Sequence, residues 1–409
     1  MAARRRRIRD DARGLRQVDG VSVWLDALFV ASAGSLAALA VGFAIFLNVL
    51  TGGALNYSYF KMDFLGLQLA FGGLQAVALT ALAVVTLINC AAVSFGGKLA
   101  AALTALKVAI IVAIGLGALF FAPGDWLHLA LIDAGGMCEG VEPAARVGSA
   151  GFAAAMLGAL WAYNGWNEMT YVAGEVRDPQ RNIPLALIGG LATVCALYIF
   201  VNISYFYVLT PTEVANVSAS SSVATAVVSR FLGPIAVSLV AAALLVSTVG
   251  ALHISTMTCS RVPFAMARDG LFIKSLARLS PRTRIPLRAL VAQAVWAGIL
   301  TLSGSYDTLT DYVIFANWIF FALVTASVFI FRRRHPAMQP SYRTWGYPVV
   351  PALFVLVSLW LIINTVLTTP GRSFVGLALI ALGLPFYYYR VRKADPSQQS
   401  SESNEESFR

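Results

Sequence analysis

Backbone groups, rather than side chains, carry the candidate chemistry of the stretch WAYNGWNEMTYVAGEVRDPQRNIP at residues 161–184. The turn dipeptide Asn164-Gly165 lies inside an apolar run and should interrupt a helix there. Such a break frees N–H and C=O groups for a charged ligand, and at membrane depth it is tolerated only where it lines a cavity or is buried in protein. A kink repaired by a neighbouring helix is the alternative. We favour the cavity, with a wall formed by the flanking aromatics Trp161, Tyr163, Trp166 and Tyr171.

Lys107 is the second candidate, because it is the one Lys or Arg that lies well inside an apolar run, LAAALTALKVAIIVAIGLG. Holding a charge at mid-bilayer costs on the order of 2.5–3.5 kcal/mol, so a functional role is the default interpretation. The alternative is a lysine that snorkels to the headgroups. Lys107 lies nine residues from Lys98, which places it at ~13 Å depth by helical rise. That depth is too great for comfortable snorkelling, so the functional role is favoured.

Other polar groups point to no enzyme. His253, in STVGALHISTMTCSR, is read as an interhelical hydrogen-bonding group, with a proton-titrating group as the alternative. The sequence contains no G-x-S-x-G, H-E-x-x-H or P-loop motif, and it has only three histidines. Its four cysteines show neither metal spacing nor a disulfide framework. We therefore predict a protein that is not an enzyme and that has no cofactor and no metal site.

The elements that position these groups must be membrane helices, because the composition excludes a soluble domain. Of 409 residues, 58% are hydrophobic and 12% are charged, against nearly half and about a quarter in soluble proteins. Apolar runs of about 17–25 residues recur along the chain and suit helices rather than the ~10-residue strands of a barrel. Ten such runs are predicted to be transmembrane helices, near residues 24–50, 68–93, 99–122, 149–173, 183–209, 232–260, 287–304, 309–331, 348–367 and 373–389. The predicted organisation is a basic segment 1–23, a transmembrane domain 24–390 and a polar, disordered tail 391–409.

The net charge of +10 is distributed unevenly along the chain. With loops assigned alternately to two sides, 25 of the 30 Lys and Arg fall on the side of the N-terminus. Such asymmetry follows the positive-inside rule, so both termini are predicted to be cytoplasmic in a multi-pass protein of the cell membrane. The Arg-rich start is interpreted as a cytoplasmic anchor rather than a signal peptide or a nucleic-acid tag. The predicted partners are therefore the lipid bilayer and a small molecule, with no nucleic acid.

The block WAYNGWNEMTYVAGEVRDPQRNIPLALIGG…NISYF closely resembles the sixth helix, inner loop and seventh helix of L-type amino acid transporters. These are the light-chain-like branch of the amino acid–polyamine–organocation superfamily. The K-x8-K-V-A pattern around Lys107, the SRVPFAMARDG loop with its downstream P-x-x-R, and FANW at 315–318 also match, in the right order. The resemblance covers about residues 24–390. It implies an all-α, LeuT-like fold of two inverted five-helix repeats and transport of L-amino acids by alternating access, mostly by exchange.

Carried over onto this sequence, the resemblance implies a substrate site at the helix break. Trp161 is similar to the aromatic gate over the substrate. The unwound strip, whose carbonyls would accept the substrate ammonium, corresponds to the backbone of Ala162, Tyr163, Asn164 and Gly165. Carbonyls at a helix break form the negative end of a dipole, which suits a cation.

The resemblance also implies side-chain positions in the pocket. Ser35 and Trp318 are similar to residues that line the pocket for the substrate side chain, and Asn317 is expected to be a structural neighbour. The aromatic lining by Trp161 and Trp318 favours neutral amino acids, small or branched.

Four charged positions receive roles from the resemblance. Lys107 matches a fifth-helix lysine whose ammonium stands where sodium-coupled relatives hold a sodium ion, which implies sodium independence. Glu175, Arg177 and Arg181 are similar to inner-gate or loop-packing residues, and a solvated charged loop is the alternative for them.

The sequence departs from the family pattern at its start. The first predicted span matches the family's third helix, and no GSGIF-like motif occurs in the sequence. Ten helices are thus expected in place of twelve, without the first two. The N–H groups that hold the substrate carboxylate would be absent with them. A shortened or frame-disrupted gene, or a misplaced start, is the interpretation.

Two functions stay open at this point. One is sodium-independent transport or exchange of L-amino acids. The other is a truncated, non-transporting membrane protein that acts as a remnant or an interaction module. The loop TGGALNYSYFKMDFLG lacks the cysteine that animal light chains use to bond a heavy subunit. No disulfide-linked heavy subunit is therefore expected.

Overall fold

The structure is a computed structural model that describes residues 21–64, 67–91, 93–131, 136, 148–218, 221–268, 272–302, 306–334, 336, 344–368 and 370–381. Of the two predicted end segments, 1–23 and 391–409, only residues 21–23 lie within this part of the chain, and they begin the first helix. The described residues are mostly helical and contain one two-stranded sheet.

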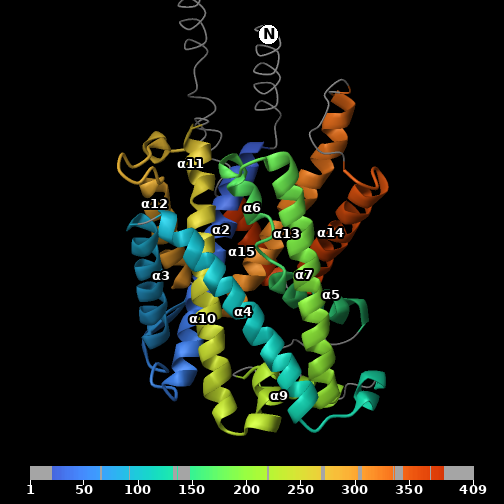
Figure 1. The fold of residues 1–409 in the computed structure, drawn as a ribbon. Coiled ribbons are helices and arrows are strands. Elements are labelled where there is room, and N and C mark those ends of the chain that lie inside the picture. Colours follow the sequence, from blue (N-terminus) through green and yellow to red (C-terminus); the bar gives the residue numbers. More distant parts are fainter. Residues whose placement is uncertain are drawn as a thin grey trace, which may run out of the picture.

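Each of the ten predicted apolar runs contains a helix. Figure 1 shows how these helices are arranged. They are α2 (Val21–Leu50), α3 (Gly73–Ala91), α4 (Val93–Phe121), the pair α5 (Gly148–Ala162) and α6 (Glu168–Tyr171), α7 (Pro179–Val208), α10 (Ile235–Cys259), α12 (Leu287–Thr301), α13 (Tyr306–Arg334), α14 (Val349–Thr368) and α15 (Pro370–Ala381). Short elements between them are η1 (Trp126–Ala130), η3 (Ala173–Glu175), α8 (Pro211–Ala215), α9 (Val223–Leu232), α11 (Arg261–Arg268) and η4 (Lys274–Ala277).

Seven of the described helical segments are long and apolar enough to cross a membrane: those of α2, α3, α4, α7, α10 with α11, α13 and α14. The runs predicted near 149–173 and 287–304 contain shorter helices, because the first is broken and α12 has 15 residues. In the run predicted near 373–389, α15 ends at Ala381 and the remaining residues lie outside the described part.

The run predicted as a helix near 68–93 begins instead as a strand. β1 (Ser58–Phe64) pairs antiparallel with β2 (Leu67–Gly72), and α3 starts only at Gly73. The physical reason is a close approach of backbone: a Cβ at Gly72 would lie 2.2 Å from the Tyr57 carbonyl oxygen. The glycine pair therefore lets the end of β2 and the start of α3 lie close to the backbone that precedes β1.

α2 is the central helix of the bundle and packs against α10, α13, α3 and α12. Small residues let membrane helices approach closely, and a Cβ at Gly34 would lie 2.6 Å from Val313 of α13. The face of α2 that forms this core carries alanines with no exposed surface: Ala33, Ala37, Ala38, Ala40 and Ala44. This close packing fixes α2 beside the helix that carries the FANW motif.

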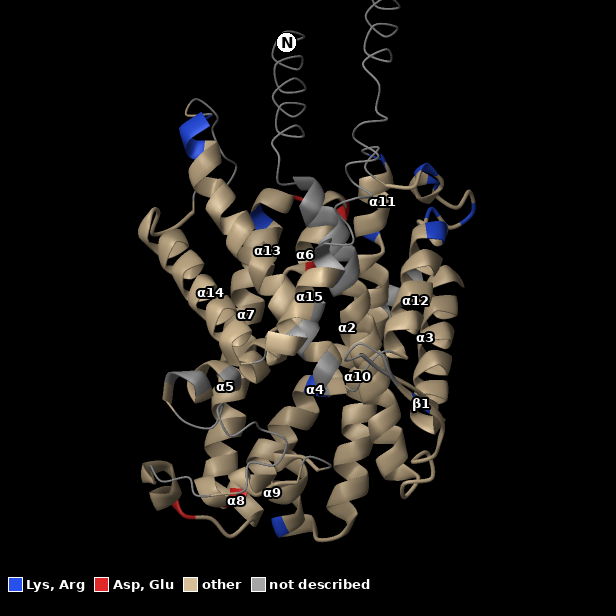
Figure 2. Ribbon diagram, turned by 180° about the vertical axis from the view of Figure 1, so that it is seen from behind, with Lys and Arg blue, Asp and Glu red and all other residues tan. Residues whose placement is uncertain are grey.

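Basic residues gather at one end of the bundle, where α11 lies and α13 ends (Figure 2). Within the described residues this end holds Arg261 and Arg268 of α11, Lys274 of η4, and Arg332–Arg334 at the end of α13. The N-terminal end of α2 is at the same end of the bundle (Figure 1). The three-dimensional arrangement thus brings together the basic loops that the sequence assigned to one side.

Candidate binding site at the helix break

The helix breaks at the predicted dipeptide. α5 ends at Ala162, residues 163–167 form turns, and α6 begins at Glu168. Gly165 has a φ of +102°, a conformation that glycine adopts readily and other residues rarely. The local sequence therefore determines where the backbone leaves the helix.

The carbonyls predicted to hold a ligand have different partners in the structure. The Ala162 carbonyl accepts a hydrogen bond from the Tyr198 hydroxyl of α7 at 2.6 Å. The Gly165 carbonyl accepts the first N–H of α6 at 3.0 Å. Among the described residues, no hydrogen bond is donated to the carbonyls of Tyr163 and Asn164. Of the four predicted carbonyls, these two are therefore the ones that the described residues leave without a donor.

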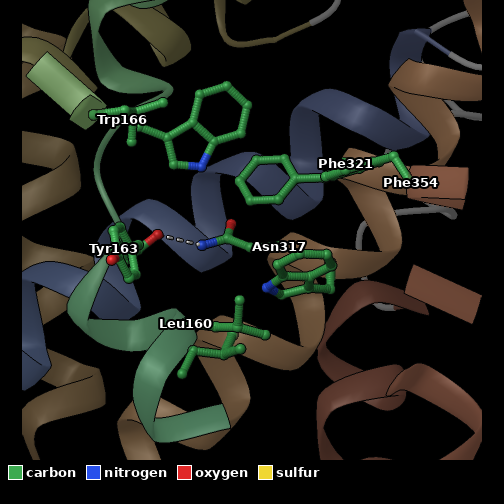
Figure 3. Close-up of a pocket in the computed structure, with 10 residues that line it drawn as sticks. Leu160, Tyr163, Trp166, Asn317, Phe321 and Phe354 are labelled. Atoms are coloured by element: carbon green, nitrogen blue, oxygen red, sulfur yellow. Dashed lines mark hydrogen bonds between the residues drawn. The ribbon is translucent and has the colours of Figure 1, made fainter. Parts of the chain in front are cut away.

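A cavity of about 310 Å³ lies beside the break (Figure 3). This volume is at the lower end of the range for small-molecule sites. The lining is mostly apolar and aromatic and comes from α5, the break, α7, α13 and α14: Leu160, Tyr163, Asn164, Trp166, Leu191, Ile314, Asn317, Trp318, Phe321 and Phe354. The break and the cavity are thus one site.

Asn164 links the break to two neighbouring helices. Its Nδ2 donates to Ser35 Oγ of α2 at 3.5 Å, and its Oδ1 accepts from Asn317 Nδ2 of α13 at 3.3 Å. Figure 3 shows Asn317 reaching toward the break. Trp318, predicted for the pocket, does line the cavity, whereas Ser35 lies behind Asn164 and outside the lining. Asn317 was expected only as a structural neighbour and is itself part of the lining.

The aromatic wall includes residues that the sequence interpretation missed. Trp318 stacks on Phe354 of α14 with ring centroids 5.5 Å apart, and Trp166 lies 5.1 Å from Phe321. Phe321 and Ile314 could have been found from their spacing, because residues three and four apart from Trp318 share its helix face. Phe354 gives no such signal, since it lies on another helix.

Trp161, the predicted gate, lies outside the cavity lining in this structure. Its indole N–H donates to the Tyr306 hydroxyl at 2.8 Å, and the two rings meet edge to face at 6.3 Å. Trp161 also packs against the core around α2. Tyr306, the first residue of α13, therefore holds the Trp161 indole on the α2 side of the break.

Lys107 lies in the middle of α4, next to α10 and apart from the cavity lining. Its Cε is 3.2 Å from the position of a Cβ at Gly250, so a larger residue there would press on the lysine stem. The lysine is partly buried, and within the described part of the chain it forms no salt bridge. A charge in this position is consistent with the predicted sodium-replacing role, which stays a prediction.

The loop after the break contains one paired charge. Glu175 of η3 forms a salt bridge with Arg261, with 3.0 Å between Glu175 Oε1 and Arg261 Nε. Arg177 and Arg181, predicted with it as gate or loop residues, are exposed. The structure thus brings Glu175 to α11 but leaves the two arginines on the surface.

α10 presents polar groups to two neighbours. Asn89 Nδ2 of α3 lies 3.1 Å from His253 Nδ1, an interhelical hydrogen bond of the kind predicted for His253. Further along α10, Ser255 Oγ and Thr258 Oγ1 donate to the carboxylate of Glu168 at 2.8 and 2.6 Å. Sequence reasoning missed Glu168 because its partners lie 87 and 90 residues away.

A mostly helical bundle with several membrane-length helices and a broken helix beside an aromatic cavity is the architecture of a multi-pass membrane protein. The family model described as amino acid permease matches residues 16–387. The chain therefore belongs to the amino acid permease family. The predicted membrane-transporter fold and the resemblance to L-type amino acid transporters are confirmed.

Named relatives are amino acid transporters and exchangers. The chain is 34% identical over 234 residues to b(0,+)-type amino acid transporter 1 of Homo sapiens, which covers 57% of this chain and 47% of that protein. It is 33% identical over 248 residues to the serine/threonine exchanger SteT of Bacillus subtilis (strain 168), 59% of this chain and 56% of that protein. Over 331 residues it is 28% identical to the large neutral amino acids transporter small subunit 2 of Oryctolagus cuniculus, 78% of this chain and 58% of that protein. The chain spans about half the length of these curated relatives.

Proposed function

We propose that this chain transports or exchanges neutral L-amino acids across the membrane by alternating access, without sodium. The observation that carries the proposal is the pair of carbonyls at Tyr163 and Asn164, beside a cavity of about 310 Å³. An amino acid brings an ammonium group, and carbonyls at the end of α5 are the negative end of a helix dipole. The predominantly apolar lining suits an uncharged side chain, because a second charge there would be costly to desolvate.

The geometry also supports a hinge at Gly165, between α5 and α6. Gly165 separates α5, whose end faces the cavity, from α6, which is bound to α10. A few residues at an element end can absorb the dihedral changes of a hinge. Opening the site alternately to the two sides of the membrane would then need rotation about this break rather than a rearrangement of the bundle.

Lys107 has a place in this proposal as a fixed cation. Its ammonium would replace the stabilising charge that a sodium ion supplies in sodium-coupled relatives, so substrate binding would not depend on sodium. The uneven basic charge supports an orientation with both termini cytoplasmic and a location in the cell membrane. The proposed carrier works without a disulfide-linked heavy subunit.

The test is amino acid binding by the purified 409-residue chain, measured by scintillation proximity with a pool of labelled neutral amino acids. We expect saturable binding that is lost when Asn164 and Gly165 are both replaced by alanine. A matched control is Asn202→Ala, because this asparagine is exposed and its side chain donates to the Tyr198 carbonyl of its own helix. Absence of saturable binding by the wild-type chain would contradict the proposal.

Two further arms of the same assay examine the role of Lys107. Binding should be equal in sodium and in choline buffers, and Lys107→Ala should lower it by more than about tenfold, because the fixed cation that stands in for sodium is lost. Lys61→Ala is the control, since Lys61 is exposed on β1. Undiminished binding by Lys107→Ala would remove the role given to this lysine.

A further inference from the structure

A carboxylate fastens the segment after the helix break to α10. Glu168 is the first residue of α6, three positions after Gly165. Its Oε1 accepts from Ser255 Oγ at 2.8 Å and its Oε2 accepts from Thr258 Oγ1 at 2.6 Å. Ser255 and Thr258 are buried, at 8% and 5% exposure, and their spacing of three residues puts them on one face of α10. We call Glu168, Ser255 and Thr258 the α6 clasp.

The environment of this carboxylate differs from that of two others. Glu213 pairs with Arg230 at 2.6 Å, and Glu175 pairs with Arg261 at 3.0 Å. The Thr210 backbone N–H and the Arg230 guanidinium hold the pKa of Glu213 below its ordinary value. Glu168 has hydroxyl donors instead, and in the described part of the chain no salt bridge reaches it. A partly buried carboxylate without a basic partner is costly to keep ionised.

The α6 clasp can hold Glu168 in either protonation state. When the carboxylate is ionised, both hydroxyls donate to it. When it is protonated, its O–H can donate to Thr258 Oγ1, whose own hydrogen can turn to the Ile254 carbonyl at 3.0 Å. A hydroxyl both donates and accepts, so the geometry needs no rearrangement to take up a proton. The ionised form makes the stronger bonds, because hydrogen bonds to a charged group are about twice as strong as neutral ones.

Two other titratable groups of the described residues interact with this carboxylate. Tyr171 of α6 and the buried Cys259 of α10 are next to the carboxylate. The Glu175–Arg261 pair links η3 to α11. On α7, the titratable groups nearest the break lie toward α5 instead: the Tyr198 hydroxyl bonds the Ala162 carbonyl, and Cys195 lies beside Tyr163.

We propose that Glu168 is a proton-binding site whose occupancy sets how firmly α6 is held to α10, and that it couples a proton to the movement of the amino acid. The inference rests on the proposed transport function. Ionised Glu168 keeps the clasp closed, whereas uptake of one proton from water forms one O–H bond and weakens the hold on α10. Release of the proton restores the closed clasp. The segment after the break is thereby held less firmly when Glu168 is protonated than when it is ionised.

The first test is the pH profile of amino acid uptake into proteoliposomes. Wild-type uptake should change by about tenfold across the titration, Glu168→Gln should show a flat profile, and Glu168→Asp should restore a pH dependence. Glu213→Gln is the matched control, since this carboxylate lies in the short helix α8 and is paired with Arg230. A Glu168→Gln profile that follows the wild type would overturn the proposal.

The second test does not depend on transport. Infrared difference spectra of the purified chain, recorded as the pH is stepped, should show a carboxylic-acid C=O band that is lost in Glu168→Gln and kept in Glu213→Gln. A band unchanged in Glu168→Gln overturns the proton site even if transport is intact. Loss of the band together with absent wild-type transport leaves the proton site standing and removes the transport function instead.

A third variant, Ser255→Ala, keeps the proposal testable if Glu168→Gln does not fold. In Ser255→Ala the carboxyl group is retained but loses one donor to its ionised form. The midpoint of the infrared titration should then move to higher pH by about one unit, because a hydrogen bond to a charged group is lost. An unmoved midpoint in this variant would also overturn the proposal.

Discussion

The two halves of the broken helix are held in different ways. The end of α5 faces the cavity, and a hydrogen bond from Tyr198 to its last carbonyl ties it to α7. α6 turns away from the cavity and is tied to α10 through both oxygens of Glu168, with the Glu175–Arg261 pair one step further on. Three of the four lining residues that this segment contributes, Leu160, Tyr163 and Asn164, thus precede Gly165, whereas the contacts to α10 follow it.

This difference indicates which contacts must break for the site to open. Hydrogen bonds to a charged group contribute about 1.5–3 kcal/mol each, whereas an exposed salt bridge contributes about 0–1 kcal/mol. The α6 clasp should therefore dominate the hold on α10, and the Tyr198 bond should mainly tune the cavity side. The contributions of these contacts can be ranked by comparing the effects of substitutions at the break, at Tyr198 and at Glu175.

The largest effect is expected at the break itself. Gly165→Val places a β-branched residue at a φ of +102°, where strain of about 1–3 kcal/mol is expected. We expect uptake into proteoliposomes to fall by at least about tenfold, because both halves lose their orientation at once. The measurement is initial uptake normalised to protein in the vesicles.

Gly158→Ala provides the control for that substitution. Gly158 lies within α5, and a Cβ there meets nothing within 4 Å. Alanine in a helix should be neutral or more stable by roughly 0.5–1 kcal/mol. Equal losses in both variants would show that any change in this segment is harmful and that the break has no special role.

The sequence indicated the break but not the way each half is held. Asn164-Gly165 is a local turn signal, so its effect could be predicted without knowing any neighbour. The partners of Glu168 lie 87 and 90 residues away, and the partner of Ala162 lies 36 residues away. Such contacts depend on which helices pack together, and hydropathy fixes the existence of helices but not their neighbours.

The same distinction explains the errors in the helix boundaries. Apolar runs marked the positions of ten helical segments, but hydropathy could not separate β2 from α3, since both are apolar. The deciding feature was the close approach at Gly72, which is a tertiary contact. In the cavity lining, Trp318 was predicted from the FANW motif, and Phe321 could be predicted from helical spacing. Phe354 could not be predicted, because its place in the lining depends on the packing of α14 against α13.

A smaller effect, of opposite sign, is expected from Tyr198→Phe. Removing the hydroxyl frees the Ala162 carbonyl, which can then accept from the substrate ammonium, and the edge-to-face contact with Tyr163 at 5.0 Å is retained. One hydrogen bond of about 1 kcal/mol corresponds to roughly fivefold tighter binding. Competition binding with unlabelled amino acids measures the change.

Tyr205→Phe is the control, because Tyr205 packs in a separate cluster with residues of α4 and α9. Weaker binding by Tyr198→Phe would reverse the interpretation. The hydroxyl would then be part of the substrate grip rather than a competitor for the carbonyl.

The smallest effect is expected from Glu175→Gln. Arg261 is largely covered, at 12% side-chain exposure, but Glu175 is 60% exposed, so water screens the pair and its loss should cost less than ~1 kcal/mol. Uptake should change by less than about fivefold, and the difference from wild type should shrink as salt is raised. An effect as large as that of Glu168→Gln, and insensitive to salt, would mean that η3 rather than the α6 clasp carries the anchoring of the inner half. The two acidic residues of this segment would then exchange roles, and the segment would be held at Arg261 of α11 instead of at Ser255 and Thr258 of α10.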